Sequence, residues 1–466
     1  MQLNKALEAY KEMIHAKRTA VLGFGISNRP LTKTLIQWGA RVTVFDKKEE
    51  EAFSNTVDEF KAMGVDFSLG EGYLDNLSGF DVIFRTPGMR FDLPQIQREI
   101  NKGAELTSEM EVFMKLCPAF IYAVTGSDGK TTTTTLIYEM LQQQGYSCYL
   151  GGNIGTPLLD RVHEMNEADR VVLELSSFQL HTMHQSPDVA VITNVTPNHL
   201  DIHKSMEEYI DAKKNIFKYQ TANNRIVINY DNPTTRGFIP EVKASLSLFG
   251  SRQECACGAF VRNDRIIFRD HETEQEVMPL SDIRLPGMHN AENIMAAMLA
   301  VIPEVSLDTV RHVAQTFAGV EHRAEFVRSI NGVSFYNDSI GSSPTRTIAT
   351  ISAFPGNVVL IAGGYDKKLC YDELGVVLQE RAKALVLIGA TANKIEQAYM
   401  DYIGKSRVRP MPIERVKTME EAVAKAYELA RGGDVVLLSP ASASFDLYPN
   451  FMERGNHFKQ IVNRLA

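Results

Sequence analysis

The sequence predicts an α/β protein of three domains, in which a Rossmann-like domain, a central phosphate-loop domain and a second Rossmann-like domain follow one another. Apolar runs of strand type occur in all three blocks, at TAVLGFG (residues 19–25), AFIYAVTG (119–126) and NVVLIAGG (357–364). Each run ends at a glycine turn. Strands that alternate with helical sequence in this way form parallel sheets. A chain of 466 residues has room for two to four such domains.

The first block contains a degenerate dinucleotide-binding pattern. Its strands are TAVLGFG, RVTVFD (41–46) and DVIFRTPG (81–88). The turn GFGISN (23–28) follows GxGxxG except that Asn28 replaces the third glycine. Asp46 stands about 20 residues further on, where a ribose-binding acid is expected. Taken alone, this pattern is compatible with an NAD-binding domain.

The second block carries a stronger motif, TGSDGKTTTT (125–134), between a predicted strand and a predicted helix. Glycines let backbone N–H groups turn toward anionic oxygens, and the helix start adds partial positive charge. Lys130 would reach the β- and γ-phosphates, and the Thr131 hydroxyl would hold Mg²⁺. Val124 stands where GxxxxGK[ST] has its first glycine. The expected ATP contacts in this loop are Gly126, Ser127, Asp128, Gly129, Lys130, Thr131 and Thr132.

Further strands are expected in the second and third blocks. A segment at 245–285 is short-stranded and is expected to form an antiparallel extension, with the helix HNAENIMAAMLAVI (289–302) after it. Ligands of open α/β sheets lie at the carboxyl ends of the strands. The remaining expected strands are RVVLEL (170–175), DVAVITNV (188–195), RIVINYD (225–231), ALVLIGA (384–390) and DVVLLSP (434–440).

Composition argues against several classes of protein. The net charge is −8 and no basic block occurs, which argues against a nucleic-acid binder. Five cysteines without CxxC spacing fit a reducing compartment, and the pair Cys255 and Cys257 lacks nearby partners for a zinc site. The N-terminus has no apolar signal-type stretch, and no run of about 18 apolar residues occurs. We therefore expect a cytoplasmic protein without membrane insertion.

Three polar residues, in the order Glu, His and Lys, follow the phosphate loop along the sequence. Glu174 ends a predicted strand, His199 follows another, and Lys213 lies on the next helix. Singly, they would be a solvated carboxylate, a structural histidine and a surface lysine. In this order after TGxxGKTT they resemble the Mur ligases. The resemblance implies ATP and two Mg²⁺ ions, with Thr131, Glu174, His199 and a carbamylated Lys213 as ligands.

The same resemblance extends to the nucleotide-binding arm. LPGMHNAENIMAA is similar to the family's GxHNxxN motif, with Asn290 and Asn293 as the matching residues. Asn290 could alternatively cap the helix. Arg323 in AGVEHRAE and Asp338 in YNDSIGSSPT match ATP contacts of the family. Many relatives have lysine directly after this NDS, whereas here Ile340 follows.

Three features favour the branch of the family that joins D-glutamate to UDP-N-acetylmuramoyl-L-alanine. They are the Rossmann-like first block, the motif SSFQL, and LLSPASASFDLYPNFMERGNHF (437–458). The residues matching UDP-substrate contacts are Ser27, Asn28, Asp46, Lys47, Gly88, Asn153 and Ser176. Those matching D-glutamate contacts are Ser342, Lys367, Ser444, Phe445 and Phe451.

The implied reaction transfers the γ-phosphoryl group of ATP to the L-alanine carboxylate, after which the amine of D-glutamate attacks the acyl phosphate. Lys130, Glu174, His199 and Lys213 are the expected catalytic residues, and domain closure is expected. We expect a monomer with domains 1–108 for the UDP-substrate, 109–319 for ATP and 320–466 for D-glutamate. The alternatives are a sister ligase that adds another amino acid, an NAD-dependent oxidoreductase, and a phosphate-loop switch or binding protein.

Overall fold

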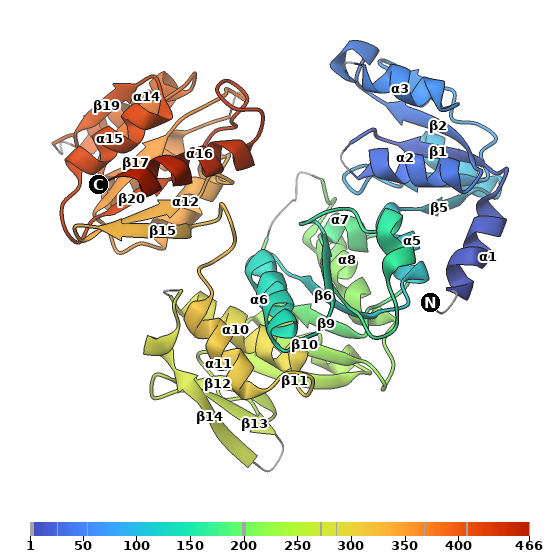
Figure 1. The fold of residues 1–466 in the computed structure, drawn as a ribbon, viewed down its shortest axis with the longest axis horizontal. Coiled ribbons are helices and arrows are strands. Elements are labelled where there is room, and N and C mark those ends of the chain that lie inside the picture. Colours follow the sequence, from blue (N-terminus) through green and yellow to red (C-terminus); the bar gives the residue numbers. More distant parts are fainter. Residues whose placement is uncertain are drawn as a thin grey trace. The chain divides into compact units, whose positions relative to one another are not determined.

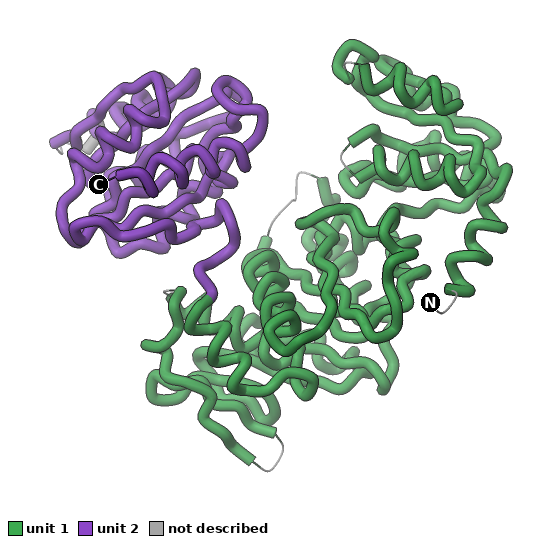
Figure 2. The backbone as a smooth tube through the Cα atoms, in the orientation of Figure 1, with its two compact units in different colours: residues 1–316 green, residues 317–466 purple. Residues whose placement is uncertain are grey.

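The computed structural model contains three α/β sheets (Figure 1). It describes residues 4–25, 27–53, 55–197, 202–270, 273–285, 287–367, 369–406 and 409–465. The chain divides into two compact units, residues 1–316 and 317–466 (Figure 2). The first unit holds two of the sheets and the second unit holds one. The expected three-sheet α/β fold is therefore confirmed, while the three exact domain boundaries stay a prediction.

The first sheet is fully parallel, with strand order β3-β2-β1-β4-β5. Because β1 leads outward to β2 and the chain later returns to β4, the strand order reverses beside β1, which is where such sheets bind ligands. Its strands are β1 (Arg18–Leu22), β2 (Arg41–Asp46), β3 (Asp66–Leu69), β4 (Val82–Arg85) and β5 (Glu105–Thr107). Its helical elements are α1 (Lys5–Ile14), α2 (Asn28–Gln37), η1 (Glu50–Phe53), α3 (Thr56–Ala62) and α4 (Pro94–Asn101).

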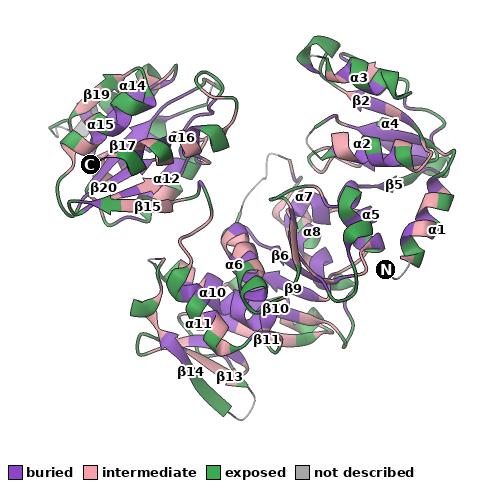
Figure 3. Cartoon of the chain, in the orientation of Figure 1, coloured by how far each residue is buried: buried purple, intermediate pink, exposed green. Residues whose placement is uncertain are grey.

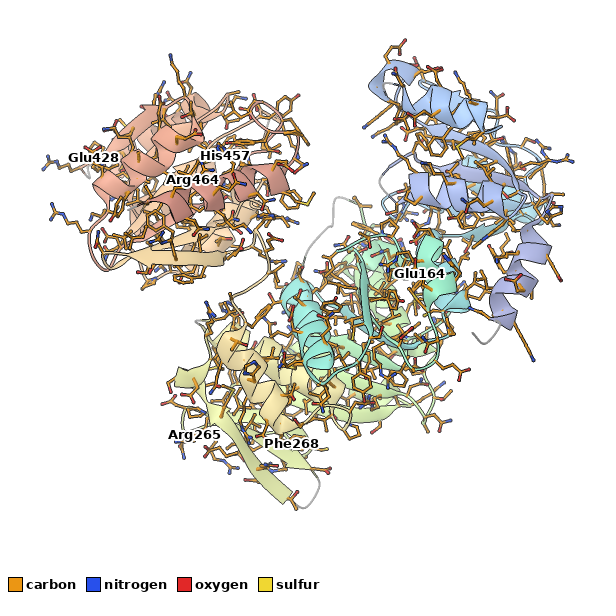
Figure 4. The ribbon with its side chains drawn as sticks, in the orientation of Figure 1. Glu164, Arg265, Phe268, Glu428, His457 and Arg464 are labelled. Carbon is orange, nitrogen blue, oxygen red and sulfur yellow. The ribbon has the colours of Figure 1, made fainter. Side chains whose placement is uncertain are left out.

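The second sheet has nine strands in the order β14-β13-β12-β11-β10-β9-β6-β8-β7. Pairing is parallel from β7 to β12 and antiparallel from β12 to β14. The expected antiparallel extension is thus present but begins later than residue 245, because β11 still pairs in parallel with β10. Arg265 and Phe268 mark the extension in Figure 4.

The strands of the second sheet are β6 (Phe120–Thr125), β7 (Cys148–Gly152), β8 (Arg170–Glu174), β9 (Val189–Ile192), β10 (Arg225–Asn229), β11 (Ser245–Gly250), β12 (Gly258–Arg262), β13 (Arg265–Asp270) and β14 (Thr273–Pro279). The helical elements are α5 (Glu109–Leu116), α6 (Lys130–Gln143), η2 (Leu159–Glu164), α7 (Ser177–Leu180), α8 (Met206–Lys218), α9 (Pro233–Arg236), η3 (Ile239–Glu241), η4 (Leu280–Asp282), α10 (Met288–Val301) and α11 (Leu307–Thr316). Helices α6 and α10 pack against each other beside this sheet (Figure 1).

The third sheet forms the second unit, with strand order β15-β16-β20-β17-β18-β19. Only β15 is antiparallel to its neighbour. The strands are β15 (Glu325–Ile330), β16 (Val333–Asn337), β17 (Val358–Ala362), β18 (Ala382–Ile388), β19 (Ile413–Val416) and β20 (Val435–Leu438). The helices are α12 (Pro344–Ser352), α13 (Asp372–Arg381), α14 (Ala392–Ser406), α15 (Met419–Leu429) and α16 (Phe451–Arg464).

Burial explains the uninterrupted apolar runs of the sequence. The central strands are covered on both faces, so both sets of alternating side chains are apolar (Figure 3). One hydrophobic core continues from the first sheet into the second and includes Tyr10, against which the partly buried ring of Trp38 packs edge-on at 5.9 Å. None of the helices within the described residues combines the length and apolar character that membrane crossing needs.

Candidate active site

The phosphate loop joins the end of β6 to the start of α6 and depends on two glycines. Gly129 has φ of 77°, and a Cβ there would lie 2.5 Å from Asn293 Oδ1. Gly126 has φ of 153°, and a Cβ there would lie 1.9 Å from Thr193 Oγ1. No side chain fits at either position without displacing a neighbour. The loop therefore brings the backbone close to its surroundings at the positively polarised start of a helix.

Neighbouring elements fix the first half of this loop. The backbone N–H groups of Ser127 and Asp128 donate to the carbonyl and the side-chain oxygen of Asn194, both at 2.9 Å. The Ser127 hydroxyl lies 2.9 Å from the Tyr209 hydroxyl. Lys130 Nζ donates to the Ser127 carbonyl at 2.9 Å. The backbone N–H groups of Ser127 and Asp128 are therefore already hydrogen-bonded. The N–H groups in the first turn of α6 are the ones that remain to bind a phosphate.

Lys213 is buried beneath the loop, with only 1% of its surface exposed. Its Nζ donates to the Gly126 carbonyl at 2.7 Å and lies 4.7 Å from the centroid of the Tyr209 ring. Burial, followed by the charge of Lys130, lowers the pKa of Lys213 well below its usual value, although Asp128 and Glu174 act in the opposite direction. A neutral amine is the form that reacts with carbon dioxide, so the position suits a carbamate.

Glu174 ends β8 and is 2% exposed. Its Oε1 accepts a hydrogen bond from Asn153 Nδ2 at 2.8 Å, while its Oε2 is buried without a hydrogen-bond partner among the described residues. A buried carboxylate oxygen without a donor suits a hard cation such as Mg²⁺. Thr131, at the start of α6, is also buried. His199, the other predicted ligand, lies outside the described residues.

The predicted nucleotide-binding residues Asn290 and Asn293 connect α10 to the phosphate loop. Thr133 Oγ1 donates to Asn293 Oδ1 at 3.2 Å, and Asn293 Nδ2 lies 3.4 Å from Asn290 Oδ1. Asn293 thus holds the start of α6 in place. The alternative that Asn290 caps the helix is wrong, because Gly287 occupies the N-cap and Asn290 lies inside α10.

Two of the predicted UDP-substrate residues use their side chains within the first sheet. Asp46 accepts from the backbone N–H of Phe24 at 2.6 Å and of Lys48 at 3.0 Å. Asn28 is buried and donates to the Gly23 carbonyl at 2.8 Å. Both residues therefore hold the glycine turn in place. Ser27, Lys47 and Gly88 are exposed, and Ser176 begins α7 through a capping box with Gln179.

In the second unit, Asp338 lies in a buried hydrogen-bonded group after β16. Its Oδ2 accepts from Ser439 Oγ at 2.6 Å, and its Oδ1 accepts from the Ala324 N–H at 3.2 Å. Burial raises the pKa of Asp338 to about 6, although its hydrogen bond with Ser439 and, to a smaller extent, the charge of Arg323 oppose this rise. Ile340, which replaces the lysine of many relatives, donates its backbone N–H to the His322 carbonyl at 3.1 Å.

The predicted D-glutamate residues of this unit divide into exposed and buried groups. Lys367 Nζ lies 5.8 Å from the centroid of the Phe445 ring, which is 61% exposed. Ser444 is buried directly beside Phe445, whereas Ser342 is half-buried. Phe451 begins α16 and packs edge-on against the ring of His322 at 5.9 Å. The exposed cation and ring are the members of this set that are accessible to a ligand.

A glycine loop at a helix start, with a buried lysine and a buried carboxylate oxygen without a donor beside it, is typical of enzymes that bind a nucleoside triphosphate and transfer its phosphoryl group. Three family models match the chain: Mur ligase MurD-like N-terminal domain at residues 17–108, Mur ligase middle domain at 124–301, and Mur ligase, glutamate ligase domain at 322–442. The chain belongs to the Mur ligase family. This membership argues against the oxidoreductase and switch-protein alternatives.

Curated relatives match over almost the full length. The UDP-N-acetylmuramoylalanine--D-glutamate ligase of Acetivibrio thermocellus is 58% identical over 464 residues, covering 99% of this chain and 100% of the relative. The ligase of the same name from Ruminiclostridium cellulolyticum is 51% identical over 464 residues, with the same coverage.

Solved structures support the fold. The UDP-N-acetylmuramate-alanine ligase MurC of Thermotoga maritima has a TM-score of 0.56 at 17% identity and covers 96% of this chain and 99% of its own. The MurF ligase of Thermotoga maritima in complex with ADP has a TM-score of 0.54 at 18% identity, covering 98% of this chain and 97% of its own.

Proposed function

We propose that this chain joins D-glutamate to UDP-N-acetylmuramoyl-L-alanine and converts ATP to ADP and phosphate in the same reaction. The observation that carries this proposal is full-length identity of 50–58% to several ligases named for that reaction. A sister ligase that adds another amino acid is the second candidate, and no feature of the described residues favours it. The cytoplasmic location and the monomeric state expected from the sequence are part of the proposal; five free cysteines fit a reducing compartment.

In the first step, a carboxylate oxygen of L-alanine attacks the γ-phosphorus of ATP and ADP leaves. Positioning and charge stabilisation supply most of the catalysis in such transfers. The first turn of α6 and Lys130 would hold the phosphates. Mg²⁺ would be held by Thr131, Glu174, His199 and the carbamate of Lys213, and when bound it would neutralise phosphate charge.

Lys213 enters this scheme as an anion. Its neutral nitrogen attacks the carbon of carbon dioxide and loses a proton, which leaves an N-linked carbamate. An ammonium at this depth would repel both Lys130 and a divalent cation. Its low pKa, caused mainly by burial, supports the change of charge.

In the second step, the amine of D-glutamate attacks the acyl phosphate, and the tetrahedral intermediate expels phosphate to leave an amide. Lys367 is an exposed cation beside Phe445 and would pair with a side-chain or main-chain carboxylate of D-glutamate. Asp338 and Arg323 would contact ATP from the second unit. Because these contacts belong to a different unit from the phosphate loop, the reaction would need domain closure.

The test is phosphate release with ATP, Mg²⁺ and UDP-N-acetylmuramoyl-L-alanine. D-glutamate is compared with L-glutamate, L-alanine and diaminopimelate. We expect release that depends on D-glutamate. Release with another of these amino acids would move the chain to a sister activity, and no release with any of them would refute a ligase function.

A further inference from the structure

Two arginines enclose the turn that carries Gly88 at the carboxyl end of β4. Arg85 ends β4 and is 2% exposed. Its Nη1 donates to the carbonyls of Pro87 and Met89, each at 2.6 Å. A single guanidinium thus fills the inside of the turn and fixes the backbone on both sides of Gly88.

The other nitrogen of the same guanidinium reaches the second sheet's domain. Arg85 Nη2 donates to the Phe178 carbonyl at 3.1 Å and to Thr182 Oγ1 at 3.0 Å. Phe178 lies in α7, the helix that begins directly after Ser176. The guanidinium therefore connects the Gly88 turn to the helix that Ser176 caps. Both elements carry a predicted contact to the UDP-substrate, Gly88 in the turn and Ser176 at the start of α7.

Arg90 makes a second connection from the far end of the turn. It donates to the Ile202 carbonyl at 2.8 Å and to Glu208 Oε1 at 2.9 Å, and Asp92 holds its other side at 2.8 Å. Glu208 lies in the first turn of α8, the helix that carries Lys213. Arg90 hydrogen bonds lower the pKa of Glu208 to about 2, so the ion pair persists at neutral pH.

The surroundings of Glu208 also contain two histidines. One ligand atom from each of His181, His203 and Glu208 lies within 4.8 Å of the others, a spacing that a metal ion could use. The guanidinium of Arg90 already contacts both carboxylate oxygens, Oε1 at 2.9 Å and Oε2 at 3.2 Å. A divalent cation would have to displace this charge. The cluster is therefore better explained as part of the contact between the two domains.

We propose that Arg85 and Arg90 form a clamp that positions the UDP-substrate for phosphoryl transfer. They are positioning residues, since they act through the Gly88 turn, α7 and α8. A substrate held by its UDP part in the first domain must present its carboxylate beside Glu174 and Lys213 in the next domain. The clamp sets the relative placement of these two sites, and this role depends on the proposed function.

The expected loss of rate follows from how closely the substrate carboxylate must be aligned with the phosphate loop. A displacement of about 1 Å at a reacting centre can cost roughly 100-fold in rate. Lysine keeps the charge of Arg85 but cannot reproduce a planar fork that donates to several oxygens. Under the proposed function, UDP alone contacts only residues 1–108 and ATP contacts the phosphate loop, so loss of the contacts between these two regions should change neither affinity. Only Arg85→Lys also disturbs the Gly88 turn itself.

Three variants separate the connections. Thr182→Val removes one crossing hydrogen bond and leaves the hold of Arg85 on its own turn intact. Arg85→Lys removes the fork, and Arg90→Met removes the second connection. The control is Arg98→Met on α4, because the contacts of Arg98 with Glu99 and the Leu77 carbonyl stay within the first domain. Thermal unfolding verifies that each full-length variant is folded.

The measured quantities are kcat/KM for UDP-N-acetylmuramoyl-L-alanine and the Kd values of UDP and of a non-hydrolysable ATP analogue. We expect kcat/KM to fall about 10- to 100-fold for Arg85→Lys and about 3- to 10-fold for the other two test variants. Both Kd values should stay within about twofold of wild type for Thr182→Val, Arg90→Met and Arg98→Met, and Arg98→Met should also keep its kcat/KM. Arg85→Lys also loosens the Gly88 turn, so its Kd for UDP should rise, but by much less than its kcat/KM falls.

Two results overturn the clamp. Wild-type kcat/KM in all three test variants would show that the crossings do not position the substrate. If the Kd of UDP for Arg85→Lys rises as much as kcat/KM falls, Arg85 acts only on the Gly88 turn and does not position the substrate between the two domains. A wild-type chain without D-glutamate-dependent phosphate release would instead refute the proposed function, and the clamp's role with it.

Discussion

Replacing Lys213 by alanine tests the proposed carbamate most directly. The substitution removes a buried nitrogen that donates to the Gly126 carbonyl at 2.7 Å. If a carbamate forms there, the variant loses an anion that helps to hold Mg²⁺ against the phosphates. Loss of one preorganised charge-stabilising group typically costs about 10²- to 10³-fold in kcat. We expect a loss of this size.

The truncated side chain also leaves space for a rescuing anion. Short carboxylates such as formate or acetate resemble the carbamate head group and should partly restore phosphate release as their concentration rises. Sodium chloride at equal ionic strength is the comparison, because it supplies ions without a carboxylate. The variant should remain folded, since the lost buried hydrogen bond is worth about 1–3 kcal/mol and alanine removes the unfavourable burial of an amine.

The matched control is Lys214→Ala, one residue further along α8. Lys214 pairs with Glu241 at 2.6 Å and is partly exposed, so its loss should change kcat by less than about twofold. A fully active Lys213→Ala variant would refute the carbamate. An inactive but folded variant that formate and acetate fail to rescue would leave Lys213 as a catalytic residue without carbamate chemistry.

Three further substitutions test other parts of the site. Gly129→Ala places a side chain at a residue with φ of 77° and directs it toward Asn293. We expect the free energy of unfolding to fall by about 1–2 kcal/mol and nucleotide binding to weaken. Unchanged urea unfolding and an unchanged ATP titration would contradict this. Glu174→Gln keeps the shape of the side chain but removes the charge, so phosphate release should need more Mg²⁺; an unchanged Mg²⁺ titration would count against Glu174 as a ligand. Burial raises the pKa of Asp338 to about 6. Its contribution to stability is therefore complete below its unfolded pKa of about 4 and lost as pH rises through 6, by about 2–3 kcal/mol. Urea unfolding should show that the free energy of unfolding falls with rising pH in the wild type and not in Asp338→Asn. An equal pH dependence in both proteins would refute a raised pKa for Asp338.

Local sequence patterns predicted much of this fold, because a parallel strand that is buried on both faces is an uninterrupted apolar run in the sequence. Apolar runs that end in glycine turns identified strands such as β6 and β17, and the phosphate loop followed β6 as expected. The start of the antiparallel extension was less predictable. Whether β11 pairs in parallel or antiparallel depends on its neighbour β10 and on the path of the chain between them, which the residues of β11 do not encode alone.

The site was less predictable where its contacts join distant parts of the chain. Lys213, read by itself, suggested a surface residue, and only the family resemblance indicated its role. Tyr209 was missed, although its hydroxyl lies 2.9 Å from Ser127 Oγ, 82 residues away in the sequence. Arg85 was missed for the same reason, since its partner Thr182 is 97 residues away. An arginine at a strand end carries no local sign of such a partner.

The position of Trp38 has a practical consequence for measurement. It is the single tryptophan of the chain, and it packs against Tyr10 in the core shared by the first two sheets. The second unit contains no tryptophan. Selective excitation of indole fluorescence therefore reports on residues 1–316 alone, whereas circular dichroism reports on the whole chain. A separation of the two signals during denaturation would show that a part of the chain remote from Trp38, such as the unit that contains Asp338, unfolds in a transition of its own.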